Sequence, residues 1–333
     1  VAVRNNVDPI SHIAVGDTDS PEVLSGTDVL TVRGVFTNPL YQFNPTAGAY
    51  SVIGDPPTSG TLVISDKTPT GIPQNLEPFR DIIDRTEFKP EALLVVSPLD
   101  DALYAVVKLN NSSSYTEESG VITQVSLAFD ISCGTYCNEF NAISAGGSYP
   151  STMTTAAFAG ILEEYRYYIR EVREIPGDDS SRLSPRLSRA RFYPGTEVAY
   201  LEDDSNFQAD VADNILDLQV ALGIDSAPTI DDVILESDPP DADDDWLFNS
   251  PADDSTDTDK WVGTAPDFTK LFYVRINTLA RTDRQARGTE ADLLDLVEDK
   301  DYSVAPGLEY NTGDQRAFRR RWMQTVIDMR NVS

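Results

Sequence analysis

The sequence predicts an α+β protein dominated by antiparallel β-sheet, with two short helices and one acidic loop insertion. The clearest observation is a period of two over residues 216–224, where the apolar positions are Leu216, Leu218, Val220, Leu222 and Ile224. Such alternation is typical of a strand, because successive side chains point to opposite faces of a sheet. Further stretches rich in β-branched and aromatic residues recur between turn-forming residues, and helical spacing is confined to two short segments.

In the first half of the chain, the expected strands are Thr27–Phe36, Thr61–Ser65, Ala92–Ser97, Ala102–Leu109 and Val121–Phe129. The last three are joined by a short turn and by a polar loop at 110–120, which favours an antiparallel meander. A helix is expected at Asn75–Asp84, because its apolar residues share one side at helical spacing and Asn75 can cap the first turn.

In the second half, the expected strands are Tyr165–Val172, Leu187–Tyr193, Leu216–Ile224, Leu271–Arg281 and Trp322–Met329. The stretch Thr155–Tyr165 fits a helix or a strand. A second helix is expected at Thr289–Asp299, where Leu293, Leu296 and Val297 would line one face.

The charge of the chain limits what it can bind. Among its 333 residues, 55 are acidic and 26 are basic, which gives a formal charge of -29. This balance argues against nucleic acid and anionic lipid as partners, since both need a basic surface. No apolar run approaches the roughly 18 residues of a membrane-spanning helix.

The stretch 226–260 is dense in Asp, Ser and Pro, so we expect an exposed acidic insertion between paired strands. Within it, Asp253, Ser255, Asp257 and Asp259 have the alternate spacing of oxygen ligands in calcium loops. The glycine and glutamate of the complete EF-hand pattern are missing, so the alternative is a solvated loop without metal.

Cys133 and Cys137 are separated by three residues, a spacing that differs from redox and zinc motifs. In an exported protein they would form a local disulfide; alternatively they stay unbonded, because so small a ring needs a bent backbone. We predict no catalytic residue, since the chain has one histidine, His12, and none of the common nucleophile or nucleotide motifs. Asp217 and Asp328 lie in strands, but on the polar phase, so both are expected at the surface.

A basic cluster precedes the last strand. It consists of Arg316, Arg319, Arg320 and Arg321, with Phe318 and Trp322 beside them. In so acidic a chain, these arginines are expected to pair with neighbouring carboxylates, and a partner-binding patch is the alternative.

Several stretches in fixed order carry a resemblance to a known family. They are GTDVLTVRG (26–34), YRYYIRE (165–171), LSRARFYPGT (187–196), NILDLQVALGID (214–225), a Trp-containing acidic insertion, YVRINTLART (273–282) and RRRWMQTVIDMRN (319–331). Together they resemble PilW-like minor pilins of the type IV pilus, in the pilin and pseudopilin superfamily. The resemblance implies one pilin-like domain over residues 1–333, and an N-terminal α-helix upstream of Val1 that anchors such proteins in the membrane.

The resemblance also implies a function. Such a protein is a non-catalytic minor pilin without a cofactor, which primes pilus assembly and sits at or near the tip. Its partners would be other minor pilins, the major pilin and a tip adhesin. It would lie in the inner membrane with a periplasmic head before assembly, and in the extracellular pilus afterwards. Alternatives are a type II secretion pseudopilin of the J kind and, from another class, a secreted acidic hydrolase or carbohydrate-binding β-domain. A carboxylate desolvated among apolar residues would favour the hydrolase.

Overall fold

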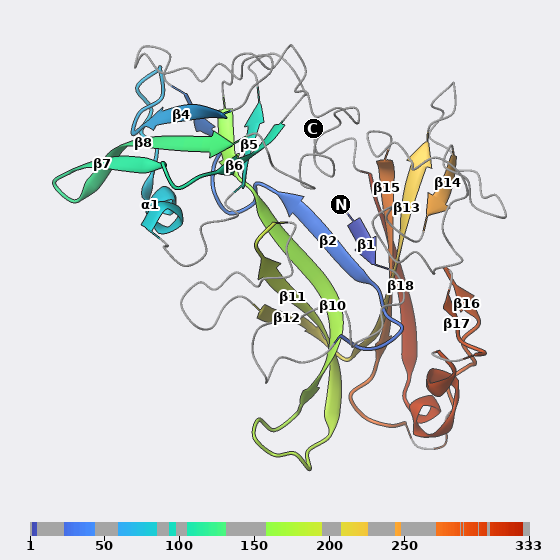
Figure 1. Ribbon diagram of the computed structural model, residues 1–333. Helices are drawn as coiled ribbons and strands as arrows, with labels where there is room; N and C mark the ends of the chain where they lie inside the picture. Colours follow the sequence, from blue (N-terminus) through green and yellow to red (C-terminus); the bar gives the residue numbers. More distant parts are fainter. Residues whose placement is uncertain are drawn as a thin grey trace. The chain divides into compact units, whose positions relative to one another are not determined.

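The structure is a computed structural model, drawn in Figure 1. It describes residues 2–4, 23–43, 59–84, 93–97, 105–130, 158–194, 208–225, 244–247, 271–286, 288, 290–298, 300–304 and 307–328. The chain divides into two compact units, which are described separately. Unit 1 comprises Val1–Val32, Tyr165–Phe192 and Glu197–Ser333; unit 2 comprises Arg33–Glu164 and Tyr193–Thr196. The prediction of one domain over residues 1–333 stays a prediction.

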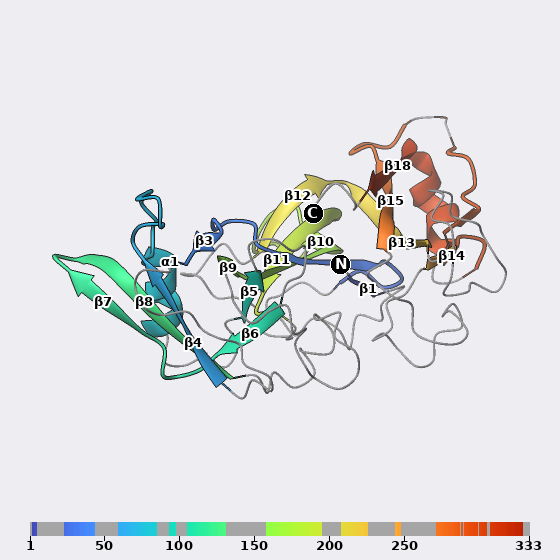
Figure 2. The ribbon, with the colours of Figure 1, turned by 90° about the horizontal axis from the view of Figure 1, so that it is seen from above.

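Unit 1 is built mainly from two sheets (Figure 1). The five-stranded sheet has the order β1 (Ala2–Arg4), β2 (Val29–Gly34), β10 (Glu163–Arg173), β11 (Leu183–Phe192) and β12 (Gln208–Asp213). The four-stranded sheet has the order β14 (Asp244–Leu247), β13 (Ile215–Asp225), β15 (Leu271–Arg281) and β18 (Arg320–Asp328). All three pairings of the four-stranded sheet are antiparallel, and Figure 2 shows β15 between β13 and β18.

Strand β13 is buried on both faces. On one face, Leu218, Val220, Leu222 and Ile224 pack in a cluster that also contains Leu30 and Ile169 of the five-stranded sheet. A register shift between Ile215 and Asp217 places Leu216 in a different cluster, with Leu279. The predicted strand is therefore confirmed, but its apolar residues do not all share one face.

The second face of β13 is covered by the segment from residue 290 to 318. This segment contains β16 (Leu296–Val297), β17 (Lys300–Asp301) and two 3-10 helices, Leu308–Asn311 and Gly313–Ala317. Its Leu294, Tyr302 and Tyr310 join the cluster of Leu216 and Leu279.

The helix predicted at Thr289–Asp299 is wrong. Residues 290–295 belong to no regular element, and 296–297 form β16. The backbone N–H of Leu294 donates to the side chain of Asn311, and that of Ala291 donates to the carbonyl of Arg316. Leu294 is buried, whereas the predicted core residues Leu293 and Leu296 are exposed. Contacts with a segment distant in sequence replaced the local helical bonds.

Unit 2 contains a seven-stranded antiparallel sheet and helix α1 (Glu77–Asp84). The strand order is β3 (Tyr41–Gln42), β9 (Phe158–Ile161), β5 (Leu93–Ser97), β6 (Ala105–Leu109), β8 (Val121–Asp130) and β4 (Ser59–Ser65), and β7 (Ser114–Glu118) pairs with β8. The loop predicted at 110–120 is wrong in part, because it contains β7. Ser119 and Gly120 both have positive φ, which lets them close a two-residue hairpin between β7 and β8.

The long segment of unit 2, Arg33–Glu164, begins and ends at two neighbouring points. Arg33 Nε lies 2.6 Å from Glu164 Oε2, so these residues tie the two crossings together. The carboxylate of Glu163 accepts hydrogen bonds from the backbone N–H groups of Phe36 and Thr37. The pair of Arg33 and Glu164, 131 positions apart in the sequence, thus holds the two ends of this segment together.

The prediction of a mainly antiparallel β protein is confirmed. The strands expected at Leu216–Ile224, Leu271–Arg281 and Trp322–Met329 correspond to β13, β15 and β18. The stretch Thr155–Tyr165, for which helix and strand both remained open, contains β9 and the start of β10. In the part of the chain that the structure describes, α1 is the one α-helix, against the two expected.

Candidate functional site

A group of polar side chains lies buried under the second face of β13. Asp217 has none of its surface exposed, and Lys300 of β17 is 3% exposed. Lys300 Nζ donates to Asp217 Oδ2 at 2.5 Å, and the hydroxyl of Tyr302 donates to the same oxygen at 2.5 Å. Asp217, Lys300 and Tyr302 are called the Asp217 cluster below.

Further hydrogen bonds surround the Asp217 cluster, although the buried Oε1 of Gln219 has no hydrogen-bond partner among the described residues. Asp217 Oδ1 accepts from the backbone N–H of Leu218 at 2.8 Å and from Gln219 Nε2 at 3.0 Å. Lys300 Nζ donates a second hydrogen bond, to the carbonyl of Gly26. Near this point, Asp28 Oδ2 accepts from the backbone N–H of Val220 at 2.6 Å.

Burial dominates the protonation of this cluster. Desolvation raises the pKa of Asp217. The positive charge of Lys300 and the hydrogen bonds that Asp217 accepts lower this pKa, but they are the smaller effects. Desolvation and the neighbouring Asp217 carboxylate both raise the pKa of Tyr302 well above its ordinary value. The Tyr302 hydroxyl therefore keeps its proton and serves as a hydrogen-bond donor.

The prediction that Asp217 lies at the surface is wrong. Alternation along β13 distinguishes two faces, but it cannot show that the segment around Lys300 covers the second face. Asp217 has the raised pKa that the hydrolase alternative requires, yet no part of it is accessible to a substrate. The burial and hydrogen bonds of Asp217 support a structural role inside the fold.

A second feature is the exposed end strand β18. Met323, Val326 and Ile327 are 41%, 50% and 40% exposed. Exposed side chains of Arg319 and Arg321 stand at the start of the strand. By strand alternation, Arg319, Arg321, Met323 and Ile327 share one face and Val326 belongs to the other; we call these five residues, at the end of the sheet, the β18 surface. Among the strands that the structure describes, β18 pairs with β15 and stands at the end of its sheet.

A pocket of about 480 Å³ lies next to Phe318, just before β18. Its lining residues are Glu171, Arg182, Leu183, Arg281, Asp283, Arg284, Gln285, Asp314, Gln315 and Phe318. The guanidinium groups of Arg281 and Arg182 lie 4.5 and 5.2 Å from the centre of the Phe318 ring. Burial, followed by the charge of Arg182, lowers the pKa of Arg281.

The basic cluster predicted from the sequence is divided between two roles. Arg316 pairs with Glu290 at 3.1 Å, as expected of an acidic chain. Arg320 instead donates to the carbonyls of Tyr310 and Asp292, and so holds the covering segment. Arg319 and Arg321 are exposed and belong to the β18 surface.

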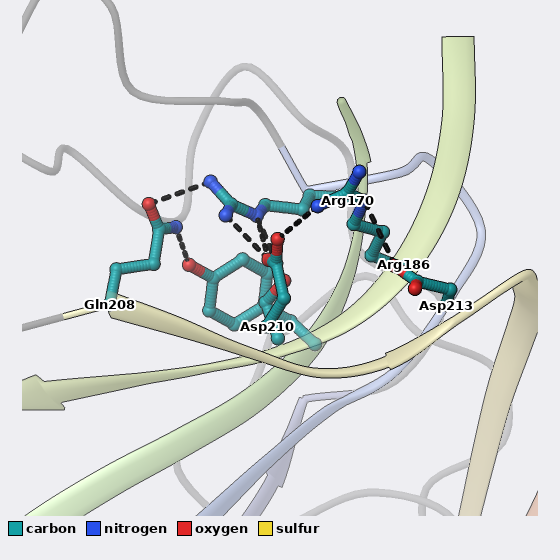
Figure 3. Close-up of polar contacts among 7 residues, drawn as sticks. Arg170, Arg186, Gln208, Asp210 and Asp213 are labelled. Carbon is teal, nitrogen blue, oxygen red and sulfur yellow. Dashed lines mark hydrogen bonds and ion pairs between the residues drawn. The ribbon is translucent and has the colours of Figure 1, made fainter. Parts of the chain in front are cut away.

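A third polar group crosses three strands of the five-stranded sheet (Figure 3). Its members are Tyr168 and Arg170 from β10, Arg186 and Ser188 from β11, and Gln208, Asp210 and Asp213 from β12. Arg170 and Arg186 approach Asp210 at 2.5 and 2.6 Å, and Arg170 also donates to Gln208 at 2.7 Å. Burial alone would raise the pKa of Asp210, but the bonds from Arg170, Arg186 and Ser188 lower it overall. These side chains are bonded to one another, so the group connects strands.

The predicted disulfide and calcium residues lie outside the described part of the chain. These are Cys133, Cys137, Asp253, Ser255, Asp257 and Asp259, and His12 lies outside it as well. Both predictions remain open. Of the insertion expected at 226–260, the structure describes 244–247, which form β14 and pair with β13. Among the described residues, no group of three or more His, Cys, Asp or Glu side chains could hold a metal ion. None of the helices there has the length and apolar character needed to cross a bilayer.

Comparison with known protein families gives a match over the second half of the chain. The family model of type IV pilus-assembly protein W, PilW, matches residues 166–331. No curated protein and no solved structure matches the chain. The matched region runs from β10 to just beyond β18 and includes the Asp217 cluster, the Phe318 pocket and the β18 surface.

Proposed function

Because residues 166–331 identify the chain as a PilW-like protein of the type IV pilus, we propose that it is a non-catalytic minor pilin that primes pilus assembly. It sits at or near the pilus tip and contacts other minor pilins, the major pilin and a tip adhesin. Before assembly its head is periplasmic and the protein is held in the inner membrane; afterwards it belongs to the extracellular filament.

The exposed β18 surface is the observation that carries this proposal. A strand at the end of a sheet with exposed apolar side chains promotes association, and proteins that stay monomeric usually protect such edges. In this chain of net charge -29, the surface also carries Arg319 and Arg321. We infer that it receives a strand of another pilus subunit with acidic side chains nearby.

The buried position of Asp217 supports the non-catalytic part of the proposal. A catalytic carboxylate has to reach the substrate, and Asp217 has no exposed surface. The pocket beside Phe318 does not include this residue among its lining.

The β18 surface can be tested with Val326→Asp. The residue is 50% exposed, so the new charge is tolerated in the isolated protein but has to lose its hydration in an interface. A loss of about 1.4 kcal/mol weakens binding at this surface about tenfold, so in a strain that lacks the wild-type gene the variant should reduce the number of pili. Pili are counted by electron microscopy, and co-purification with other pilus subunits is measured in parallel.

The matched control is Val211→Asp on β12, because Val211 is 54% exposed and the substitution is the same. This control should leave the number of pili unchanged. Equal pilus numbers in both variants, with both proteins folded, would contradict the proposed surface.

Two further readouts test the finer parts of the proposal. Gold-labelled antibody against the protein should mark the ends of pili, and uniform labelling along the filament would contradict the tip position. In the gene deletion strain, normal pili combined with a loss of protein secretion would favour the alternative of a type II secretion pseudopilin.

A further inference from the structure

The Asp217 cluster holds an amine and a carboxyl group in direct contact, away from water. The side chains of Lys300 and Asp217 are 2% and 0% exposed, and their nearest polar atoms lie 2.5 Å apart. The amine also lies 5.1 and 5.3 Å from the ring centres of Tyr302 and Tyr310. Trp322 packs edge-on against Tyr302, with 5.7 Å between the ring centres.

Burial favours the neutral form of the Asp217 carboxyl group. Taking an ammonium and a carboxylate out of water is costly, and transfer of one proton from Lys300 to Asp217 removes both charges. The raised pKa of Asp217 agrees with this transfer. A neutral amine is a nucleophile, and the carbon of a neutral carboxyl group is its electrophile.

We propose that Lys300 and Asp217 are joined by an amide bond between Nζ and Cγ, an intramolecular isopeptide cross-link formed with release of water. The proposal rests on the geometry of the Asp217 cluster and is independent of the proposed role in pilus assembly. The link requires no enzyme and no cofactor, because both reactants belong to the folded chain.

The hydrogen bonds assign a role to each oxygen of Asp217. Oδ1 accepts from Leu218 N–H and Gln219 Nε2, and these donors stabilise the negative charge that develops on it when Nζ attacks. Oδ2 accepts from the Tyr302 hydroxyl at 2.5 Å, so it is the oxygen that is protonated and leaves. Tyr302 is a positioning residue for this step.

The reaction is balanced without any other reactant. The starting pair is an ammonium with three protons and a carboxylate with none. One proton moves from Nζ to Oδ2, the freed electron pair forms the bond to Cγ, and a second proton follows to Oδ2. The Cγ–Oδ2 bond then breaks and water leaves. The third proton stays on the amide nitrogen, where the Gly26 carbonyl already accepts a hydrogen bond.

Such a link would connect β13 covalently to β17 across 83 positions of the sequence. The segment from 290 to 318 would then be fixed to the four-stranded sheet at one of its most buried points. Unfolding could not separate the two, even under a pulling force on the chain.

The experiment is an intact-mass measurement of the folded protein under reducing conditions. We expect a mass lower than that of the sequence by one water molecule, and a branched peptide joining Lys300 and Asp217 after digestion. A protein with the full mass of its sequence and separate peptides would overturn the proposal, and Lys300 and Asp217 would then be an ion pair only.

Variants locate the bond. Lys300→Arg keeps the charge but cannot form this amide, so it should have its full mass. The control Lys67→Arg changes an exposed lysine of unit 2 and should still lose one water molecule. Should Lys300→Arg fail to fold, the mass of the wild-type protein still decides the question.

Tyr302→Phe tests the positioning role. It keeps the ring and removes the hydroxyl, so a larger fraction of freshly folded protein should have the full mass, and this fraction should fall with time. An immediate and complete loss of water in Tyr302→Phe would show that the hydroxyl is not needed.

Discussion

Asp210 illustrates how much a single carboxylate contributes when two arginines converge on it. Arg170 and Arg186 reach it from two other strands, so the three residues connect β10, β11 and β12 (Figure 3). Because these bonds hold the pKa of Asp210 below its ordinary value, its contribution to stability is present above the unfolded pKa, about 3.9. That contribution is lost as the pH falls through the lower, folded pKa.

Asp210→Asn should destabilise the protein by about 1–3 kcal/mol, since charged donors lose their ionised acceptor. Chemical denaturation at neutral pH measures the loss, and an acid titration should show that the difference from wild type shrinks as the pH falls. The control is Asp213→Asn, whose side chain is 68% exposed and lies 3.2 Å from Arg186. An exposed pair is worth about 0–1 kcal/mol, so equal losses in the two variants would contradict the central role of Asp210.

The sequence predicted individual residues less well than elements. Asp217 shows the reason most clearly: its polar character and its phase in β13 indicate solvent, and its partners Lys300 and Tyr302 are more than 80 positions away. Lone polar residues on a strand carry no sign of such partners. The burial of Asp217 follows only from the knowledge that another segment covers the second face of the sheet.

At the scale of elements, strands were predicted well where residues alternate or are β-branched, as in β13, β15 and β18. The stretch Thr289–Asp299 failed because its helical spacing was weaker than its tertiary contacts. The polar strand β7 was missed because four of its five residues are exposed, so it lacks an apolar pattern. Alternating apolar residues predict strands with one buried face. They do not predict an exposed strand that is held by backbone pairing, or a segment that is held by side chains from another part of the chain.

Asn311 is the side chain that holds the covering segment in place of a helix. It accepts from Leu294 N–H at 2.7 Å and donates to the carbonyls of Leu294 and Tyr302 at 2.7 and 2.8 Å. Asn311→Ala should cost about 2–4 kcal/mol, because buried backbone groups lose their partners. Chemical denaturation measures the total, and hydrogen exchange should increase most at Leu294.

The neighbouring substitution Thr312→Ala is the control for this prediction. Thr312 is exposed, and its hydroxyl donates one bond of 3.3 Å to the carbonyl of Glu309. The expected loss is below about 1 kcal/mol. If Asn311→Ala were equally mild, the segment would be held by its apolar side chains alone.

At the scale of the whole molecule, the net charge of -29 sets the response to salt. Self-repulsion disfavours the compact state, and added salt screens it. The melting temperature should therefore rise between low and near-physiological concentrations of sodium chloride. A melting temperature that falls with salt would show that attractive pairs such as Arg33 with Glu164 outweigh the repulsion.

Melting temperatures measured in calcium chloride and in magnesium chloride test the predicted calcium loop of Asp253, Ser255, Asp257 and Asp259. Calcium and magnesium chloride at equal ionic strength screen charges alike, so equal melting temperatures indicate screening alone. A larger increase with calcium, removed by the change of all three aspartates to asparagine, would support a calcium site.

The insertion of unit 2 between β2 and β10 has a consequence for how the protein comes to be folded. These two strands are neighbours in one sheet, yet the chain makes Arg33–Glu164, which is nearly all of unit 2, between them. Closing so long a loop in an unfolded chain is slow, because the chain loses conformational entropy before the hydrogen bonds between the two strands form. If unit 2 folds first, the contact between Arg33 and Glu164 brings the two strand ends within reach. During synthesis, unit 2, most of which precedes the residues matched by the PilW model, would form first and bring β2 and β10 together. In this way it would start the five-stranded sheet, in which the matched region begins.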